Sequence, residues 1–262
     1  MHIIKSFIIA FSMYSKLPMP HTEWQEEDMR YVMCFFPLIG IVIGAAVYGV
    51  FRVWQWGTSV RDIPLWVFAL ISTVTPVLLT GGIHLDGFID TSDALASYGS
   101  RERKLEILKD SHIGAFAAIR LAVLLMLTVA GFGCLRGSAQ DFLLLGVGYF
   151  LSRTCSAIAL LTVNGAKKEG TLNTFAQAAQ RYIVLAVLVV YLAVGISVCI
   201  FLCRDGWLIG GCGLYTVLGG ALAVVYYIRM AKKQFGGLTG DLAGWFVTVF
   251  ELVWLWGICI WS

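Results

Sequence analysis

The chain alternates between long apolar runs and short polar stretches, and this alternation predicts a series of membrane-spanning helices. An apolar run of roughly 20 residues is long enough to cross the hydrocarbon core of a bilayer as an α-helix. Helices are expected because each backbone amide must find its hydrogen-bond partner within the segment when no water is present. Seven runs fit this description, at about 31–51, 63–80, 113–135, 142–163, 182–202, 207–228 and 242–261.

A shorter apolar segment precedes the first span. Residues 3–15 are too few to cross a bilayer easily, so we expect an amphipathic helix that lies in the membrane interface. Pro18 and Pro20 should end this helix, because the residue before a proline is disfavoured in the α conformation. No small-residue cleavage site follows, and we therefore do not expect a removable signal peptide.

Proline and glycine mark breaks and packing faces within the spans. Pro76 is expected to kink the second span, and the pair Gly81-Gly82 to end it. In the first span, Gly40 and Gly44 form a small-x-x-x-small pair, which predicts close packing against another helix.

The composition agrees with this fold class. Of the 262 residues, 59% are hydrophobic and only 13% are charged, which excludes an ordinary soluble domain. We predict a single all-α polytopic integral membrane domain, residues 1–262, with about seven transmembrane helices, the N-terminal interfacial helix and a polar cytoplasmic segment after the second span. The net charge of +3 gives no indication of nucleic-acid binding, and the seven cysteines include no C-x-x-C pair.

The positive charges predict the orientation of the spans. With seven spans, one side of the membrane holds 13 of the 19 Lys and Arg residues, including those at 101–109, 167–181 and 229–233. The other side holds four of them, namely Arg52, Arg61, Arg136 and Arg204. Cytoplasmic loops carry the excess of positive charge, so the first side is predicted to be cytoplasmic. Every polar motif then lies on that side.

The most polar motif lies between the second and third spans, at Gly81-Gly-Ile-His-Leu-Asp-Gly-Phe-Ile-Asp-Thr-Ser-Asp93. If this stretch is helical, Asp86, Asp90 and Asp93 fall at i, i+4 and i+7 and share one face. Three neighbouring carboxylates repel one another, and a divalent cation between them would relieve the repulsion. We therefore predict a Mg²⁺ site, with a solvated acidic helix start as the alternative.

Further polar groups need an explanation at membrane depth. Arg120, Arg153 and Glu251 are costly inside a bilayer and should face the bundle interior. Arg153 is expected either to contact substrate phosphate or to form a structural pair with Glu251.

Three other places carry candidate chemistry. The motif Gly236-Gly-Leu-Thr-Gly-Asp241 leads into the last span, so Asp241 is expected to cap that helix or to form a second wall of the aspartate site. His84 is a hydrogen-bonding residue or a catalyst. Lys109 and Asp110 are a solvated pair, or they supply a cation for phosphates.

The chain resembles the adenosylcobinamide-GDP ribazoletransferase family, also called cobalamin synthases. The resemblance rests on the 81–93 motif, on Glu102-Arg-Lys-Leu-Glu-Ile-Leu-Lys-Asp-Ser111 with Ile113-Gly114, and on Gly236-Gly-Leu-Thr-Gly-Asp241. Further support comes from Phe11-Ser-Met-Tyr-Ser-Lys-Leu-Pro-Met-Pro20, from Phe36-Pro-Leu-Ile-Gly-Ile-Val-Ile-Gly44 and from Ser152-Arg153. These landmarks follow the family's order along the whole chain.

The resemblance implies a reaction. A hydroxyl of α-ribazole, or of its 5′-phosphate, attacks the cobinamide-linked phosphate of adenosylcobinamide-GDP, and GMP leaves. Family members need Mg²⁺ and lie in the cytoplasmic membrane of prokaryotes, in contact with the lipid bilayer. The sequence is compatible both with a single chain and with a homo-oligomer. We assign Asp86, Asp90 and Asp93 to metal binding, and His84, Asp86 and Asp90 to catalysis. Candidate substrate contacts are Lys109, Asp110, Arg153, Thr239 and Asp241.

Two alternatives stay open at this point. Another membrane transferase acting on a diphosphate, such as a CDP-alcohol phosphotransferase or an aspartate-rich prenyltransferase, also places carboxylates at helical spacing. A transporter also uses helices broken at glycine and charges within the membrane, although the spans show no obvious internal repeat.

Overall fold

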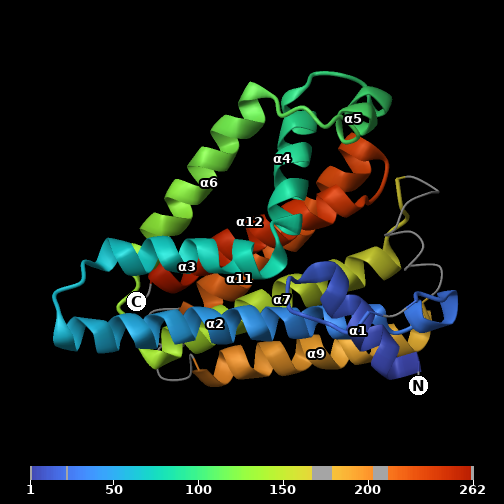
Figure 1. Cartoon of the computed structure of the whole chain (residues 1–262). Helices are drawn as coiled ribbons and strands as arrows, with labels where there is room; N and C mark the ends of the chain where they lie inside the picture. The colour runs from blue at the N-terminus through green and yellow to red at the C-terminus, as the bar shows by residue number, and fades with distance from the viewer. Residues whose placement is uncertain (1, 22, 167–178, 203–211, 261–262) are drawn as a thin grey trace.

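The computed structural model describes residues 2–21, 23–166, 179–202 and 212–260, and this part of the chain is all-α, as predicted (Figure 1). Its elements are α1 (His2–Tyr14), η1 (Glu26–Met29), α2 (Val32–Val60), α3 (Leu65–Thr80), α4 (Ile83–Ala96), α5 (Arg101–Ile107), α6 (Ala115–Cys134), α7 (Ala139–Thr162), α9 (Arg181–Leu202), α11 (Cys212–Met230), η2 (Ala231–Phe235) and α12 (Gly240–Cys259). Most of the predicted 164–181 loop, with Lys167 and Lys168, and also Arg204, lies outside the described residues.

The structure does not confirm the predicted number of seven spans. Within the described chain, five helices are long and apolar enough to cross a membrane: α2, α6, α7, α9 and α12. The predicted span at 63–80 becomes α3, whose 16 residues qualify only together with α4, and these two helices are bent by 96°. The predicted span at 207–228 begins outside the described residues and continues as α11.

The polar motifs gather at one end of the helix bundle (Figure 1). The N-terminus, α5 and the start of α12 lie at this end, whereas the C-terminus and the α2–α3 and α6–α7 connections lie at the other. This arrangement agrees with the predicted separation of polar segments and places residues far apart in sequence within reach of one another.

Glycines bring α2 and α7 into close contact, as the small-x-x-x-small pair predicted. A Cβ at Gly44 would lie 2.6 Å from the Cα of Gly146, and a Cβ at Gly40 would overlap the carbonyl of Tyr149. Small residues let two backbones approach until van der Waals contacts form along the helices. This contact holds α7, and Arg153 on it, in the centre of the bundle.

The N-terminal helix α1 is fixed to the bundle rather than lying apart from it. Asp28 in η1 is fully buried and accepts hydrogen bonds from Lys5 Nζ at 3.0 Å and from the His2 ring at 2.7 Å. Burial opposes ionisation of Asp28, but these two hydrogen bonds hold its pKa below the usual value. The ring of Phe7 also meets Phe35 of α2 edge to face, with 5.5 Å between centroids.

Candidate active site

A sharp break between α3 and α4 creates the site. Gly81 and Gly82 have φ angles of 65° and 80°, in the left-handed region that glycine adopts without steric cost. They end α3 and allow the 96° bend into α4. The predicted glycine break is therefore confirmed, and α4 carries the polar motif away from the axis of α3.

The three predicted metal ligands share one face of α4. This helix contains Asp86, Asp90 and Asp93, so their spacing of i, i+4 and i+7 is a helical spacing, as predicted. Asp86 is exposed, whereas Asp90 and Asp93 are half-buried. The carboxylates thus form a row that is open at the end nearest the α3–α4 break.

The start of α12 lies directly beside this row. A Cβ at Gly87 would sit 2.6 Å from the carbonyl oxygen of Asp241, and a Cβ at Gly244 would sit 3.0 Å from that of His84. Negative charges on Asp86, Asp241 and Asp93 all act on the Asp90 carboxylate. The expectation that the two motifs form neighbouring walls of one site therefore agrees with the geometry.

These carboxylates suit Mg²⁺ only in part. Across the described ranges, no three His, Cys, Asp or Glu side chains are arranged so that they could hold a metal ion by themselves. Mg²⁺, however, usually takes one or two protein carboxylates and completes its shell with water and substrate phosphates. The mutual repulsion around Asp90 is the electrostatic condition that a cation would relieve. The donors therefore fit a metal that arrives with a phosphorylated substrate.

The connection after α5 closes the other side of the row. The Asp93 carboxylate packs against Gly114, where a Cβ would overlap its oxygens. Lys109 and Asp110 are exposed in this connection, and Asp110 binds the His112 ring at 2.7 Å. Hydrogen bonds from the His112 side chain and backbone lower the pKa of Asp110. Asp110, one of the predicted substrate contacts, is thus hydrogen-bonded to His112, which is two residues away in the chain.

His84 does not belong to the aspartate face. Side chains two residues apart on a helix point to different sides, and His84 turns away from Asp86 into the protein interior. Its ring stacks on Tyr14 at 6.3 Å and meets Phe36 edge to face at 5.7 Å. The structure therefore separates His84 from the carboxylates with which the sequence grouped it.

Arg153 lies in the same interior region as His84. Its Nη1 bonds Glu251 Oε1 at 2.5 Å and the carbonyl of Tyr149 at 2.9 Å, and the side chain is 1% exposed. Arg153, Glu251 and His84 all line one cavity of about 80 Å³. His84 Nε2 and Arg153 Nε have no hydrogen-bond partner among the described residues. Of the two expected roles for Arg153, the structural pair has its partner in place.

Thr239, predicted as a substrate contact, caps α12. Its hydroxyl accepts a hydrogen bond from the backbone N–H of Leu242 at 3.2 Å, and the residue is buried. The expectation that Asp241 caps this helix is therefore wrong, because Thr239 occupies the N-cap position. Asp241 lies in the first helical turn instead, where a negative charge is favoured by the helix dipole.

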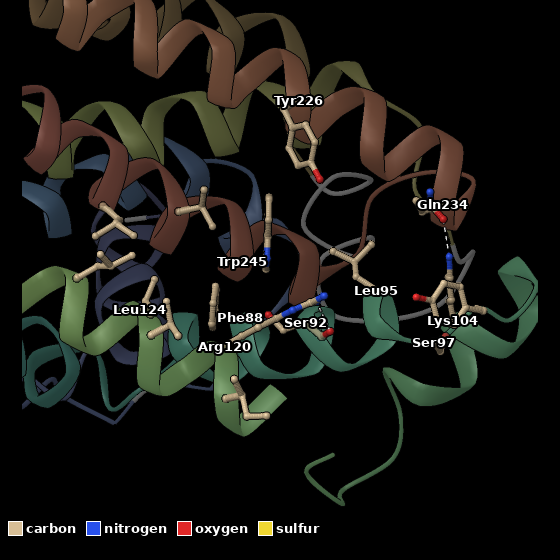
Figure 2. Close-up of a pocket in the computed structure, with 16 residues that line it drawn as sticks. Phe88, Ser92, Leu95, Ser97, Lys104, Arg120, Leu124, Tyr226, Gln234 and Trp245 are labelled. Carbon is tan, nitrogen blue, oxygen red and sulfur yellow. Dashed lines mark hydrogen bonds between the residues drawn. The ribbon is translucent and has the colours of Figure 1, made fainter. Parts of the chain in front are cut away.

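Arg120 was expected to face the bundle interior, and its side chain lines a groove between α4, α6 and α12 that is open on one side. Arg120 is exposed, and its Nη1 donates to the carbonyl of Ser92 at 2.6 Å. Figure 2 shows it in a groove beside α4, together with Lys104. Lys104 is buried and donates to Gln234 Oε1. Nothing in the sequence distinguishes Lys104 from the charged residues around it in the chain, and only folding places it in the groove.

Comparison with known proteins identifies the family. A sequence model of the family described as cobalamin-5-phosphate synthase matches residues 6–259. The adenosylcobinamide-GDP ribazoletransferase of Lachnoclostridium phytofermentans is 40% identical over 95% of this chain and 91% of its own. The proteins of the same name from Clostridium botulinum and Geobacillus sp. are 30% and 31% identical, over 100% and 95% of this chain and 99% and 93% of their own. No solved structure matches. The chain belongs to the cobalamin-5-phosphate synthase family.

Proposed function

We propose that this protein performs the final assembly of the cobalamin nucleotide loop. It joins adenosylcobinamide-GDP to α-ribazole, or to its 5′-phosphate, and releases GMP. The shared name of relatives that cover nearly the whole chain supports this activity over a CDP-alcohol phosphotransferase, a prenyltransferase or a transporter. The structural observation that carries the proposal is the meeting of α4 and α12 at Gly87 and Asp241, which brings four carboxylates to one place.

The reaction forms one phosphorus–oxygen bond and breaks another. The ribazole hydroxyl becomes bonded to the phosphate attached to cobinamide, its proton is released, and the bond from that phosphate to GMP breaks. Such a transfer depends mainly on positioning and on stabilisation of charge. Bound Mg²⁺ would supply that stabilisation by neutralising charge on the phosphate oxygens. Asp86, Asp90 and Asp93 are the proposed ligands, with Asp241 beside them.

The remaining predicted residues receive different roles. His84 lies on the inner side of α4 and Arg153 lies on α7 in the centre of the bundle. We propose that these two residues position α4 and its aspartates and do not touch the reacting atoms. Lys109 is exposed in the connection after α5, and we propose that it meets a substrate phosphate that approaches from the polar end of the bundle. The excess of positive charge at this end supports a cytoplasmic orientation in a prokaryotic membrane.

A direct assay tests the proposal. Membranes containing the protein are incubated with Mg²⁺, adenosylcobinamide-GDP and α-ribazole, and GMP release is followed alongside formation of the cobalamin product. Replacing α-ribazole by its 5′-phosphate shows which acceptor is preferred. Release of GMP that depends on the acceptor is expected. GMP release without an acceptor, or no release with either acceptor, would contradict the proposed transfer.

A further inference from the structure

A groove of about 750 Å³ runs along α6 on the side of α4 that faces away from the aspartates (Figure 2). Phe88, Ser92 and Leu95 of α4 line it, at the same helical spacing as Asp86, Asp90 and Asp93 but on the opposite face. The remaining walls come from α5, α6, α11, η2 and α12. The groove is therefore separated from the carboxylate row by the width of one helix.

The groove has a cationic end. Lys104 and Gln234 lie at this end, with Ser97 beside them, and Arg120 lies farther along at the level of Ser92 (Figure 2). Neither Lys104 nor Arg120 forms an ion pair with a carboxylate in the part of the chain that the structure describes. Two positive charges without an anionic partner favour a ligand that carries negative charge at this end.

The other end of the groove is aliphatic. Its walls there are formed by Val123, Leu124, Leu127, Val249 and Leu252. Val123 and Leu127 of α6 are 49% and 41% exposed, so the groove is open along one side. Trp245, which is buried, and Tyr226, which is exposed, line the groove between the two ends.

We propose that this groove binds an anionic phospholipid, with the phosphate at Arg120 and Lys104 and an acyl chain along α6. The order of groups along the groove, cation, aromatic ring and aliphatic wall, is the order in which a bilayer presents phosphate, interface and hydrocarbon. A reacting substrate is a poorer occupant, because the groove faces away from the carboxylates. A second copy of the chain supplies no phosphate for the two cations. The inference goes beyond the proposed function and does not depend on it.

Lipid retention tests the proposal without an activity assay. The protein is purified in mild detergent, exchanged against phosphatidylglycerol or phosphatidylcholine, and examined for bound lipid by native mass spectrometry. Wild type should retain phosphatidylglycerol preferentially. Arg120→Gln and Lys104→Gln should each weaken this retention roughly fivefold, the effect of one basic residue at an anionic lipid surface. Arg52→Gln is the control, because Arg52 is an exposed α2 arginine bonded to Tyr48.

A second variant keeps the cations and fills the aliphatic end. Leu127→Trp should reduce retention of phosphatidylglycerol, while the melting temperature in detergent verifies that each variant is folded. Equal retention of the two lipids, or unchanged retention in all three groove variants, would overturn the proposal. Displacement of lipid by inorganic phosphate would indicate a free-phosphate site. Displacement by α-ribazole 5′-phosphate would indicate a substrate groove, and disulfide-linked dimers of Leu127→Cys would indicate a second copy; each of these results also overturns it.

Discussion

Gly87 of α4 lies directly against the backbone of Asp241 of α12, and a Cβ at position 87 would sit 2.6 Å from the Asp241 carbonyl oxygen. No side-chain carbon tolerates that separation, so the two helices meet here only because residue 87 is glycine. The contact sets the distance between the aspartates of α4 and Asp241. It therefore joins two motifs that are more than 140 residues apart in the chain.

Gly87→Ala should consequently damage the site while leaving most of the fold in place. The added methyl group must push α4 from α12, and overpacking of this kind costs about 1–3 kcal/mol. We expect a lower melting temperature and a loss of GMP release. Gly133→Ala on α6 is the matched control, because a Cβ there meets nothing within 4 Å. Equal activity of both variants would show that the α4–α12 distance is unimportant.

Asp90→Asn should lower activity without unfolding the protein. Asn is nearly isosteric with Asp and removes the repulsion that Asp86, Asp241 and Asp93 exert at this position. GMP release should fall by on the order of 10²–10³, as for the loss of one preorganised electrostatic contact. The Mg²⁺ concentration for half-maximal rate should rise in parallel.

The same Mg²⁺ titration applies to Asp86→Asn and Asp93→Asn, with exposed Asp62→Asn at the other end of the bundle as control. Each variant is first checked for membrane insertion. An unshifted Mg²⁺ dependence in all three site variants would mean that the aspartates are only a solvated helix start.

Glu251→Gln tests whether Arg153 is structural. The variant leaves a buried guanidinium without its anionic partner, and breaking such a pair costs about 3–5 kcal/mol. We expect a markedly lower melting temperature with little change in KM. Arg153→Lys should lower the melting temperature as well, because Nη1 alone donates to both Glu251 and the Tyr149 carbonyl, and the shorter lysine side chain ends one atom before that position. A raised KM with unchanged melting would instead assign Arg153 to substrate phosphate.

The docking of α1 should depend on pH through Asp28. Hydrogen bonds from His2 and Lys5 outweigh the effect of burial and lower the pKa of Asp28, so the folded state favours the carboxylate. The ionised Asp28 carboxylate contributes its full stabilisation above the pKa of the unfolded state, about 3.9. This stabilisation is lost as the pH falls through the lower pKa that Asp28 has in the folded state. Asp28→Asn should therefore melt below wild type at pH 7. The difference should shrink as the pH falls below about 4, and a constant difference would contradict this origin.

Reporter fusions should test the orientation of the helices. Because 13 Lys and Arg residues fall on one predicted side and four on the other, a reporter fused after Ser97 should be cytoplasmic and one after Gly137 external. The α4–α5 connection, which contains Ser97, and the α6–α7 connection, which contains Gly137, also lie at opposite ends of the bundle (Figure 1). Reporters with reversed signals would separate the carboxylates from substrates in the cytoplasm.

Local patterns along the chain determined the helices and part of the site. Apolar runs predicted α2, α6, α7, α9 and α12 because burial in lipid demands continuous hydrophobicity over the length of a span. Gly81 and Gly82 marked the end of α3, since two consecutive left-handed residues suit glycine. The common face of Asp86, Asp90 and Asp93 followed from helical periodicity alone, which is a property of neighbouring residues.

Tertiary structure decided which groups meet. Asp241 lies beside Asp90 because α4 and α12 pack against each other at Gly87 and Gly244. The sequence of neither motif predicts this contact. His84 lies two residues from Asp86 in the chain, yet it lines the same interior cavity as Arg153. The packing of α4 against α12 determines which side of α4 is turned inward. Periodicity defines the faces of a helix, but only the neighbouring helices determine what each face touches.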